Sequence, residues 1–170
     1  MSSKTQFRVR MALYALLLVL AELLQTSVFG SLHLGLVPSI MPVAVSCISL
    51  FEGSQRGCIF GLIGGCIWAW STELSYFGAW CIVILTVIGT LAGFITERFL
   101  LRGIKTALCI SIPALLLTDG LHALVSVFSG TIPAVALITT FLPEMLIALV
   151  FCFLFYPLTA YISRIGGFHG

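Results

Sequence analysis

The sequence predicts an all-α, polytopic integral membrane protein, with six transmembrane helices in one bundle and a single domain over residues 1–170. Hydrophobic residues make up 60% of the chain and charged residues only 8%, whereas about 25% of the residues of an ordinary soluble domain are charged. The mean hydropathy is +1.19. Apolar runs fill the chain, and each span needs about 20 residues to cross about 30 Å of hydrocarbon. By this count we expect no second, soluble domain.

The apolar runs define the expected spans in order. The first follows a short basic segment and has no small-residue cleavage site after it, which indicates a retained helix and not a signal peptide. Pro143 and Glu144 are typical of the first turn of a helix, so they predict the start of the last span. The six expected spans are residues 11–29, 36–51, 57–71, 77–96, 104–128 and 141–162.

The cations predict the orientation, because Lys and Arg collect on the cytoplasmic side of a membrane. If the amino terminus is inside, all eight Lys and Arg fall on the inner side. Random assignment would give this split about once in a few hundred trials. Both termini are therefore expected inside. The charged inner loops, which offer a surface to a cytoplasmic partner, contain Glu52, Arg56, Arg98, Arg102 and Lys105.

Residues 36–51 and 57–71 are short for spans, so a re-entrant hairpin is the alternative for this pair. A hairpin would place Glu52 and Arg56 near the middle of the membrane, at a cost of several kcal/mol of desolvation unless the two were well paired. Two short spans cost less and are preferred.

Glycines recur at four-residue spacing on two of the expected spans, at Gly57, Gly61 and Gly65 and again at Gly89 and Gly93. Residues four apart share a helix face, and glycine lets two helix backbones approach closely. This face serves either packing within the bundle, which is the more common use, or contact with the helix of a partner.

Four polar residues lie inside expected spans. Glu22 and Gln25 share a face of the first span, and Asp119 and His122 share a face of the fifth at a similar depth. If these spans are neighbours, the four side chains form one hydrogen-bonded cluster. Such a cluster is either an ion, proton or ligand site or a set of contacts that holds helices together.

Catalytic, metal and cofactor motifs are absent from the sequence. The six cysteines fall in apolar runs without a Cys-x-x-Cys pair, and there is no nucleophile elbow, Walker loop or His-Glu-x-x-His helix. The net charge of +2 is too small to indicate a nucleic-acid partner. We expect no enzymatic activity, no cofactor and no bound metal, with membrane lipid around the protein.

Several short motifs occur in a characteristic order. They are Leu24-Gln25-Thr26, Gly35-Leu36-Val37-Pro38, Glu52-Gly53 before the glycine series, Ile88 to Phe94 running into Glu97-Arg98, Leu142-Pro143 and Tyr156-Pro157-Leu158. In this order the chain resembles, over nearly its whole length, the MreD family of rod-shape-determining membrane proteins. It departs from the family pattern at Ser39, where the family often carries an acidic residue.

The resemblance implies a non-enzymatic scaffold of the cell-elongation machinery in the bacterial cytoplasmic membrane. Such a protein works with membrane-anchored MreC, the MreB filament, and the peptidoglycan polymerase and transpeptidase.

The family in turn resembles the substrate-binding (S) subunits of energy-coupling-factor vitamin transporters, which are six-span bundles of similar size. Such a subunit is the alternative function, although the Ala-x-x-x-Ala-like docking face of those proteins is missing from the first span here. A proton- or cation-coupled carrier that uses Asp119 and Glu22 is a third possibility.

Overall fold

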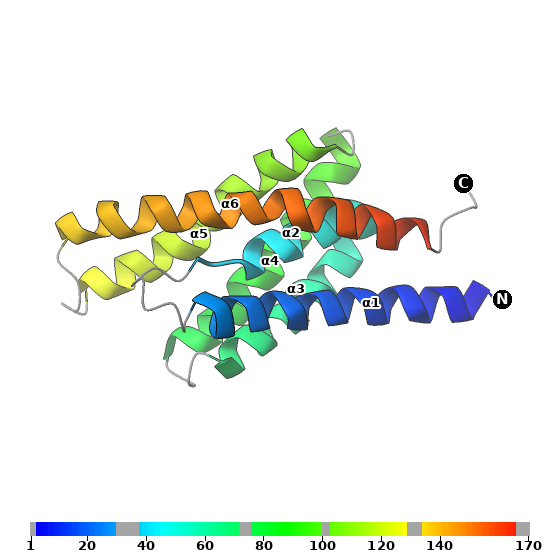
Figure 1. Cartoon of the computed structure of the whole chain (residues 1–170), viewed down its shortest axis with the longest axis horizontal. Helices are drawn as coiled ribbons and strands as arrows, with labels where there is room; N and C mark the ends of the chain where they lie inside the picture. The colour runs from blue at the N-terminus through cyan, green and yellow to red at the C-terminus, as the bar shows by residue number, and fades with distance from the viewer. Residues whose placement is uncertain (1–2, 30–37, 72–75, 100–102, 129–133, 166–170) are drawn as a thin grey trace.

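The computed structural model describes residues 3–29, 38–71, 76–99, 103–128 and 134–165, and every regular element within these ranges is a helix. Helices α1 and α6 lie along the bundle, and α1 begins at the end where α6 finishes (Figure 1). The elements are α1 (Ser3–Leu23), η1 (Leu24–Phe29), α2 (Met41–Glu52), α3 (Ser54–Ser71), α4 (Tyr76–Phe99), α5 (Ile104–Phe128) and α6 (Ala134–Arg164).

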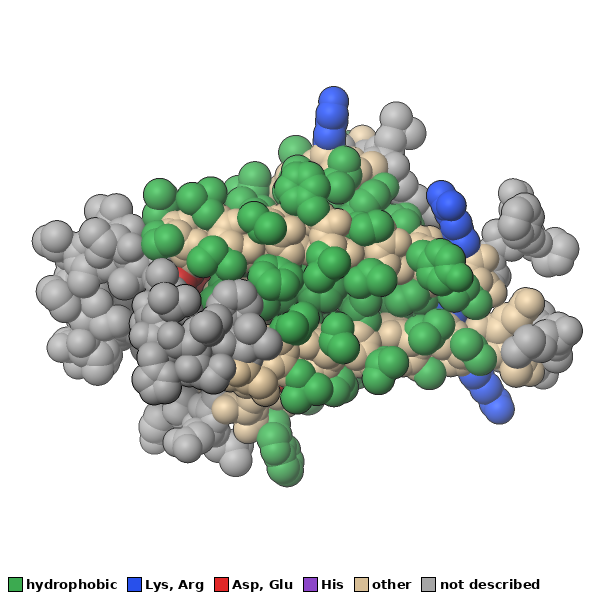
Figure 2. Space-filling model, viewed as in Figure 1, with side chains coloured by type: hydrophobic (Ala, Val, Ile, Leu, Met, Phe, Trp, Pro, Cys, Tyr) green, Lys and Arg blue, Asp and Glu red, His purple; other side chains and the backbone are tan. Residues whose placement is uncertain are grey.

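Three helices of the described part are long and apolar enough to span a membrane, and the qualifying segments are Gly78–Phe99, Ile104–His122 and Leu142–Arg164. Many of their outward side chains are hydrophobic. Leu116, Val150 and Phe153 are examples, and all three are exposed. Figure 2 shows hydrophobic side chains along the visible face, with Lys and Arg only in the half nearer the termini. A surface of this kind suits lipid and not water.

Helix α2 occupies the centre of the bundle. It packs against α1, α3, α4, α5 and α6, and all of its residues from Met41 to Leu50 are buried. A helix that is apolar on every side is stable only when it is surrounded. Its 12 residues extend about 18 Å, less than the hydrocarbon thickness of about 30 Å. Within the expected span 36–51, residues 38–40 are not helical and α2 begins at Met41, with Pro42 in its first turn. Residues 36 and 37 lie outside the described residues.

A single glycine separates α2 from α3. Gly53 has φ of 84°, in the left-handed region that glycine adopts without strain. Its N–H donates to the Ser49 carbonyl over 2.9 Å, and its own carbonyl accepts from the Gly57 N–H over 2.8 Å. On α4, Glu97 Oε1 accepts from the Ser54 N–H over 3.0 Å, so α3 is capped by α4 and begins three residues before the expected residue 57.

The glycine series forms the contact between α3 and α4, the most extensive helix pair in the structure. A Cβ atom on Gly57 would overlap the Gly89 carbonyl oxygen, and one on Gly61 would overlap that of Leu85. At Gly65 it would lie 2.6 Å from the Ile82 Cα, and the Cβ of a residue at Gly93 would lie 2.5 Å from the Gly53 carbonyl carbon. The glycine face therefore lies inside the bundle, covered by this chain's own helices.

The last helix begins earlier than expected. Pro143 and Glu144 lie inside α6, which starts at Ala134 and not at residue 141. The prediction of Pro143 as a first-turn residue is wrong, because the apolar residues from Ala134 onward continue the helix before it. A proline inside a helix removes one backbone hydrogen bond, and bundled membrane helices tolerate this where neighbours satisfy the freed carbonyl.

The α3–α4 contact predicts that Gly61→Ala destabilises the protein, because the added methyl group meets backbone atoms that cannot move alone. We expect a loss of about 1–3 kcal/mol in the free energy of unfolding, seen as a lower melting temperature in detergent. Gly120→Ala is the matched control, since no atom lies within 4 Å of its added Cβ. Equal melting temperatures for the two variants would contradict the assignment.

Candidate functional site

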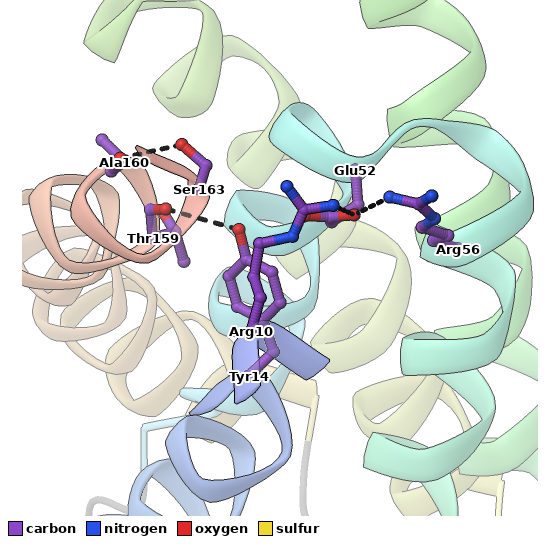
Figure 3. A network of polar contacts seen from close by, with 7 residues as sticks. All are labelled: Arg10, Tyr14, Glu52, Arg56, Thr159, Ala160 and Ser163. Atoms are coloured by element: carbon purple, nitrogen blue, oxygen red, sulfur yellow. Dashed lines mark hydrogen bonds and ion pairs between the residues drawn. The ribbon is translucent and has the colours of Figure 1, made fainter. Parts of the chain in front are cut away.

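A buried carboxylate joins three helices at the end of the bundle where α1 begins. The Glu52 side chain is only 2% exposed and lies at the end of α2. It accepts hydrogen bonds from Arg56 Nη1 on α3 over 2.6 Å and from Arg10 Nη2 on α1 over 3.2 Å. In addition, Arg10 Nε lies 3.1 Å from Glu52 Oε1. Figure 3 shows both guanidinium groups converging on Glu52.

The three groups carry one net positive charge, and Phe7 on α1 covers it. The guanidinium carbons of Arg10 and Arg56 lie 5.9 Å and 5.0 Å from the centre of its ring, within the range of cation–π attraction. Arg10 is 14% exposed and Arg56 is 42% exposed. The Glu52 carboxylate is thus enclosed, and Arg56 is the more exposed of its two partners.

The sequence placed Glu52 and Arg56 in a charged inner loop that offers a surface to a partner. The structure instead places them in α2 and α3 and buries the Glu52 side chain, because two guanidinium groups bind it. The sequence did not identify Arg10 as their partner. Arg10 lies more than a turn inside α1, where a cation needs a counter-ion. The sequence did not give this signal, because it predicted the first span to begin at residue 11, after Arg10.

The same end of α1 is also tied to α6. The Tyr14 hydroxyl donates to the Thr159 carbonyl over 3.4 Å (Figure 3), and Tyr14 is fully buried. Its ring packs edge-on against Phe60 of α3, with 5.5 Å between ring centres. These contacts fix α1 between α3 and α6, and they hold the charge network in register.

Two other predicted inner cations are separate from this network. Arg98 lies at the end of α4 with its guanidinium 5.6 Å from the Phe94 ring centre, and Lys105 is exposed at the start of α5. Arg102 lies outside the described residues. The ion pairs within the described ranges all involve Glu52, so neither Arg98 nor Lys105 shares a salt bridge there.

On the other side of the bundle, Glu22 and Gln25 bind two different neighbours. Glu22 Oε1 accepts a hydrogen bond from the Ser71 hydroxyl at the end of α3. Gln25, in the π-helical turn η1, accepts from the Ile40 N–H over 3.0 Å. Both side chains are buried. Gln25 therefore satisfies the Ile40 N–H at the N-terminal end of α2. This donor needs a protein acceptor, since Ile40 is fully buried in an apolar bundle.

Asp119 on α5 lies near the N-terminal end of α2. Its buried carboxylate is hydrogen-bonded to the Ser39 side chain, and Glu144 on α6 is close enough to act on it electrostatically. His122, three residues further along α5, is exposed. Helices α1 and α5 each pack against α2 and have no substantial contact with each other in the described ranges.

The four residues predicted to share one cluster are thus distributed around α2, and Glu22, Gln25 and Asp119 contact three different partners. One oxygen of each acid, Glu22 Oε2 and Asp119 Oδ2, is buried without a hydrogen bond among the described residues. Within those same residues, no group of three His, Cys, Asp or Glu is arranged to hold a metal ion.

The chemistry that these contacts support is cohesion between helices, with positive charge displayed at one end. The Glu52 network joins α1, α2 and α3, and the Glu22–Ser71 pair joins α1 to α3 again. No protein-family model, curated protein or solved structure matches this chain.

The network predicts that Glu52→Gln destabilises the protein strongly, because two guanidinium groups would lose their only anion in the described structure. We expect a loss of about 3 kcal/mol in the free energy of unfolding, the lower end of the range for breaking a buried pair, since Arg56 is partly exposed. Thermal unfolding in detergent measures it.

Glu97→Gln is the control for this experiment. Glu97 lies at the same end of the bundle, and a glutamine oxygen can still accept from the Ser54 N–H. Its effect should stay within about 0.5 kcal/mol. Similar losses for both variants would mean that the charge of Glu52 has no special role.

Proposed function

We propose that this chain is a non-enzymatic membrane scaffold in bacterial cell-shape control. In this role it connects MreC, the MreB filament, and the peptidoglycan polymerase and transpeptidase during elongation. The proposal rests on the resemblance to the MreD family and on one observation. Inside the bundle, the side chains of Glu52, Glu22 and Gln25 each bind a group on another element of the chain. Contacts that hold helices together are what a scaffold with fixed surfaces requires.

The topology we propose has six spans in the bacterial cell membrane, with both termini in the cytoplasm. Three helices that are long and apolar enough to cross a membrane support the membrane location. The short α2 is compatible with a six-span arrangement because the other helices surround it and its ends need not reach lipid. The Arg10–Glu52–Arg56 network lies at the end where α1 begins, in agreement with the positive-inside rule.

The surfaces that remain free suit partners of two kinds. At the proposed inner side, the exposed Arg98 and Lys105 offer positive charge to a cytoplasmic partner such as a filament. Along the sides, exposed apolar residues of α4 and α6 such as Val83 and Phe153 offer surface to the membrane anchors of other proteins. A scaffold uses both, and neither requires a reaction centre.

A pull-down in mild detergent tests the function. The tagged chain should recover an MreC-like protein and wall-synthesis enzymes, whereas an unrelated tagged six-span protein should not. Recovery of a pair of ATPases together with a tightly bound vitamin would contradict the scaffold and favour the S subunit of an energy-coupling-factor transporter.

Cysteine labelling tests the topology, after the exposed Cys66 and Cys109 are replaced by serine. In intact cells, a membrane-impermeant maleimide should leave Arg102→Cys unlabelled, because the positive-inside rule places this loop in the cytoplasm. Ser31→Cys, in an expected outer loop, is the matched control and should be labelled. The reverse pattern would overturn the orientation.

Asp119→Asn separates the scaffold from a proton- or cation-coupled carrier. The asparagine oxygen can still accept a hydrogen bond from Ser39, so the variant should fold, recover the same partners and support normal cell shape. A variant that folds and assembles but loses cell shape would indicate that the ionisable group itself is needed, as a carrier requires.

A further inference from the structure

Helices α4 and α5 leave an apolar groove between them. It has a volume of about 190 Å³ and only apolar residues and Cys109 line it. Its rims are exposed, with Leu91 and Ile95 on α4 and Leu117 on α5 each more than a third exposed. The groove therefore opens on the side of the bundle and not into the core.

Small residues at the floor create the groove. Ala92 on α4 and Ala114 on α5 are buried where the two helices face each other, and they leave a space that larger side chains would fill. Ala114 packs with Ile84 and Ile88 in a small cluster separate from the main core. The contact between α4 and α5 is accordingly less extensive than that between α3 and α4.

Two cationic residues, Arg98 and Lys105, lie beyond one end of the groove. Arg98 follows Ile95 by three residues on α4, and Lys105 precedes Cys109 by four residues on α5, so each lies one helical turn beyond the apolar lining. Both are exposed, and no described carboxylate forms a salt bridge with either. The groove thus has a positively charged end and an apolar length.

We propose that this groove binds an anionic phospholipid of the inner leaflet, with one acyl chain between α4 and α5 and the phosphate at Arg98 and Lys105. From Val87 to Ile95 the lining extends about 12 Å along α4, most of the depth of one leaflet of about 15 Å. Cavities of about 150 Å³ with similar lining hold a benzene molecule, so this volume takes an acyl segment of about six carbons or more. The inference rests on the proposed topology, which puts these cations inside. It needs no partner protein, and a partner that binds Arg98 and Lys105 would compete with the lipid phosphate.

A helix of another protein suits the groove less well. A transmembrane helix with its side chains is about 10 Å across, so it would lie over a space of 190 Å³ without entering it. The two cations would also need acidic groups on that helix at the membrane surface. A single flexible acyl chain with an anionic headgroup satisfies both the shape and the charge.

Photo-crosslinking of the purified full chain tests the proposal without any partner protein. The probe is phosphatidylglycerol with a diazirine in one acyl chain, and phosphatidylcholine with the same chain is the neutral reference. Mass spectrometry should find adducts on Val87–Ile95 and Cys109–Leu117 that form preferentially with phosphatidylglycerol. The double variant Arg98→Gln/Lys105→Gln should reduce that preference about tenfold or more, because each basic residue adds to the attraction of an anionic lipid.

Arg8→Gln/Arg164→Gln is the matched control, because it removes the same charge from exposed positions on α1 and α6 and should leave the groove adducts unchanged. Equal labelling by the two lipids, or equal effects of the two double variants, would overturn the proposal in favour of ordinary surrounding lipid. Ala114→Leu should exclude the acyl chain, and a melting temperature in detergent verifies that this variant folds.

A disulfide-linked dimer through Cys109 under mild oxidation would overturn the proposal in another way, since a second copy would then occupy the groove. Failure of the pull-down would remove the proposed partners and leave the lipid result standing. Failure of the cysteine labelling would remove the topology on which the lipid proposal rests.

Discussion

Helix α2 lies inside a ring of the five other helices, and the polar groups at its two ends therefore have to be satisfied by protein. At its N-terminal end, Gln25 accepts a hydrogen bond from the Ile40 N–H. At its C-terminal end, two arginines donate hydrogen bonds to Glu52. Both sets of contacts come from other helices. The burial of one short helix thus determines where the remaining helices can lie and which side chains they must present.

Helix α4 shows how residue size divides one helix into two surfaces. Its face toward α3 carries Gly89 and Gly93, and the two backbones meet with no room for a Cβ atom. Its face toward α5 carries Ala92 among larger residues, and a groove remains there. Close backbone contact gives α3 and α4 strong dispersion attraction, whereas the α4–α5 side keeps space that lipid can occupy.

The charged residues at the proposed inner end also form two groups, one largely buried and one exposed. Glu52 and Arg10 are committed to the fold, because the carboxylate is almost completely buried and joins three helices. Arg98 and Lys105 are exposed and share no described salt bridge, so they remain free to bind. A scaffold that works at the membrane surface needs this division, since groups that hold the protein together cannot also exchange partners.

The sequence by itself determined the helical class, the apolar character of the long helices and the glycine face, because hydropathy and four-residue spacing are local properties of a chain. It also placed Glu52 beside Arg56. Only the tertiary structure decided that α2 is central, that Arg10 completes the Glu52 network, and that Asp119 meets Ser39 and not Glu22. Spacing defines which residues share a face, but which faces meet depends on the packing of all the helices together.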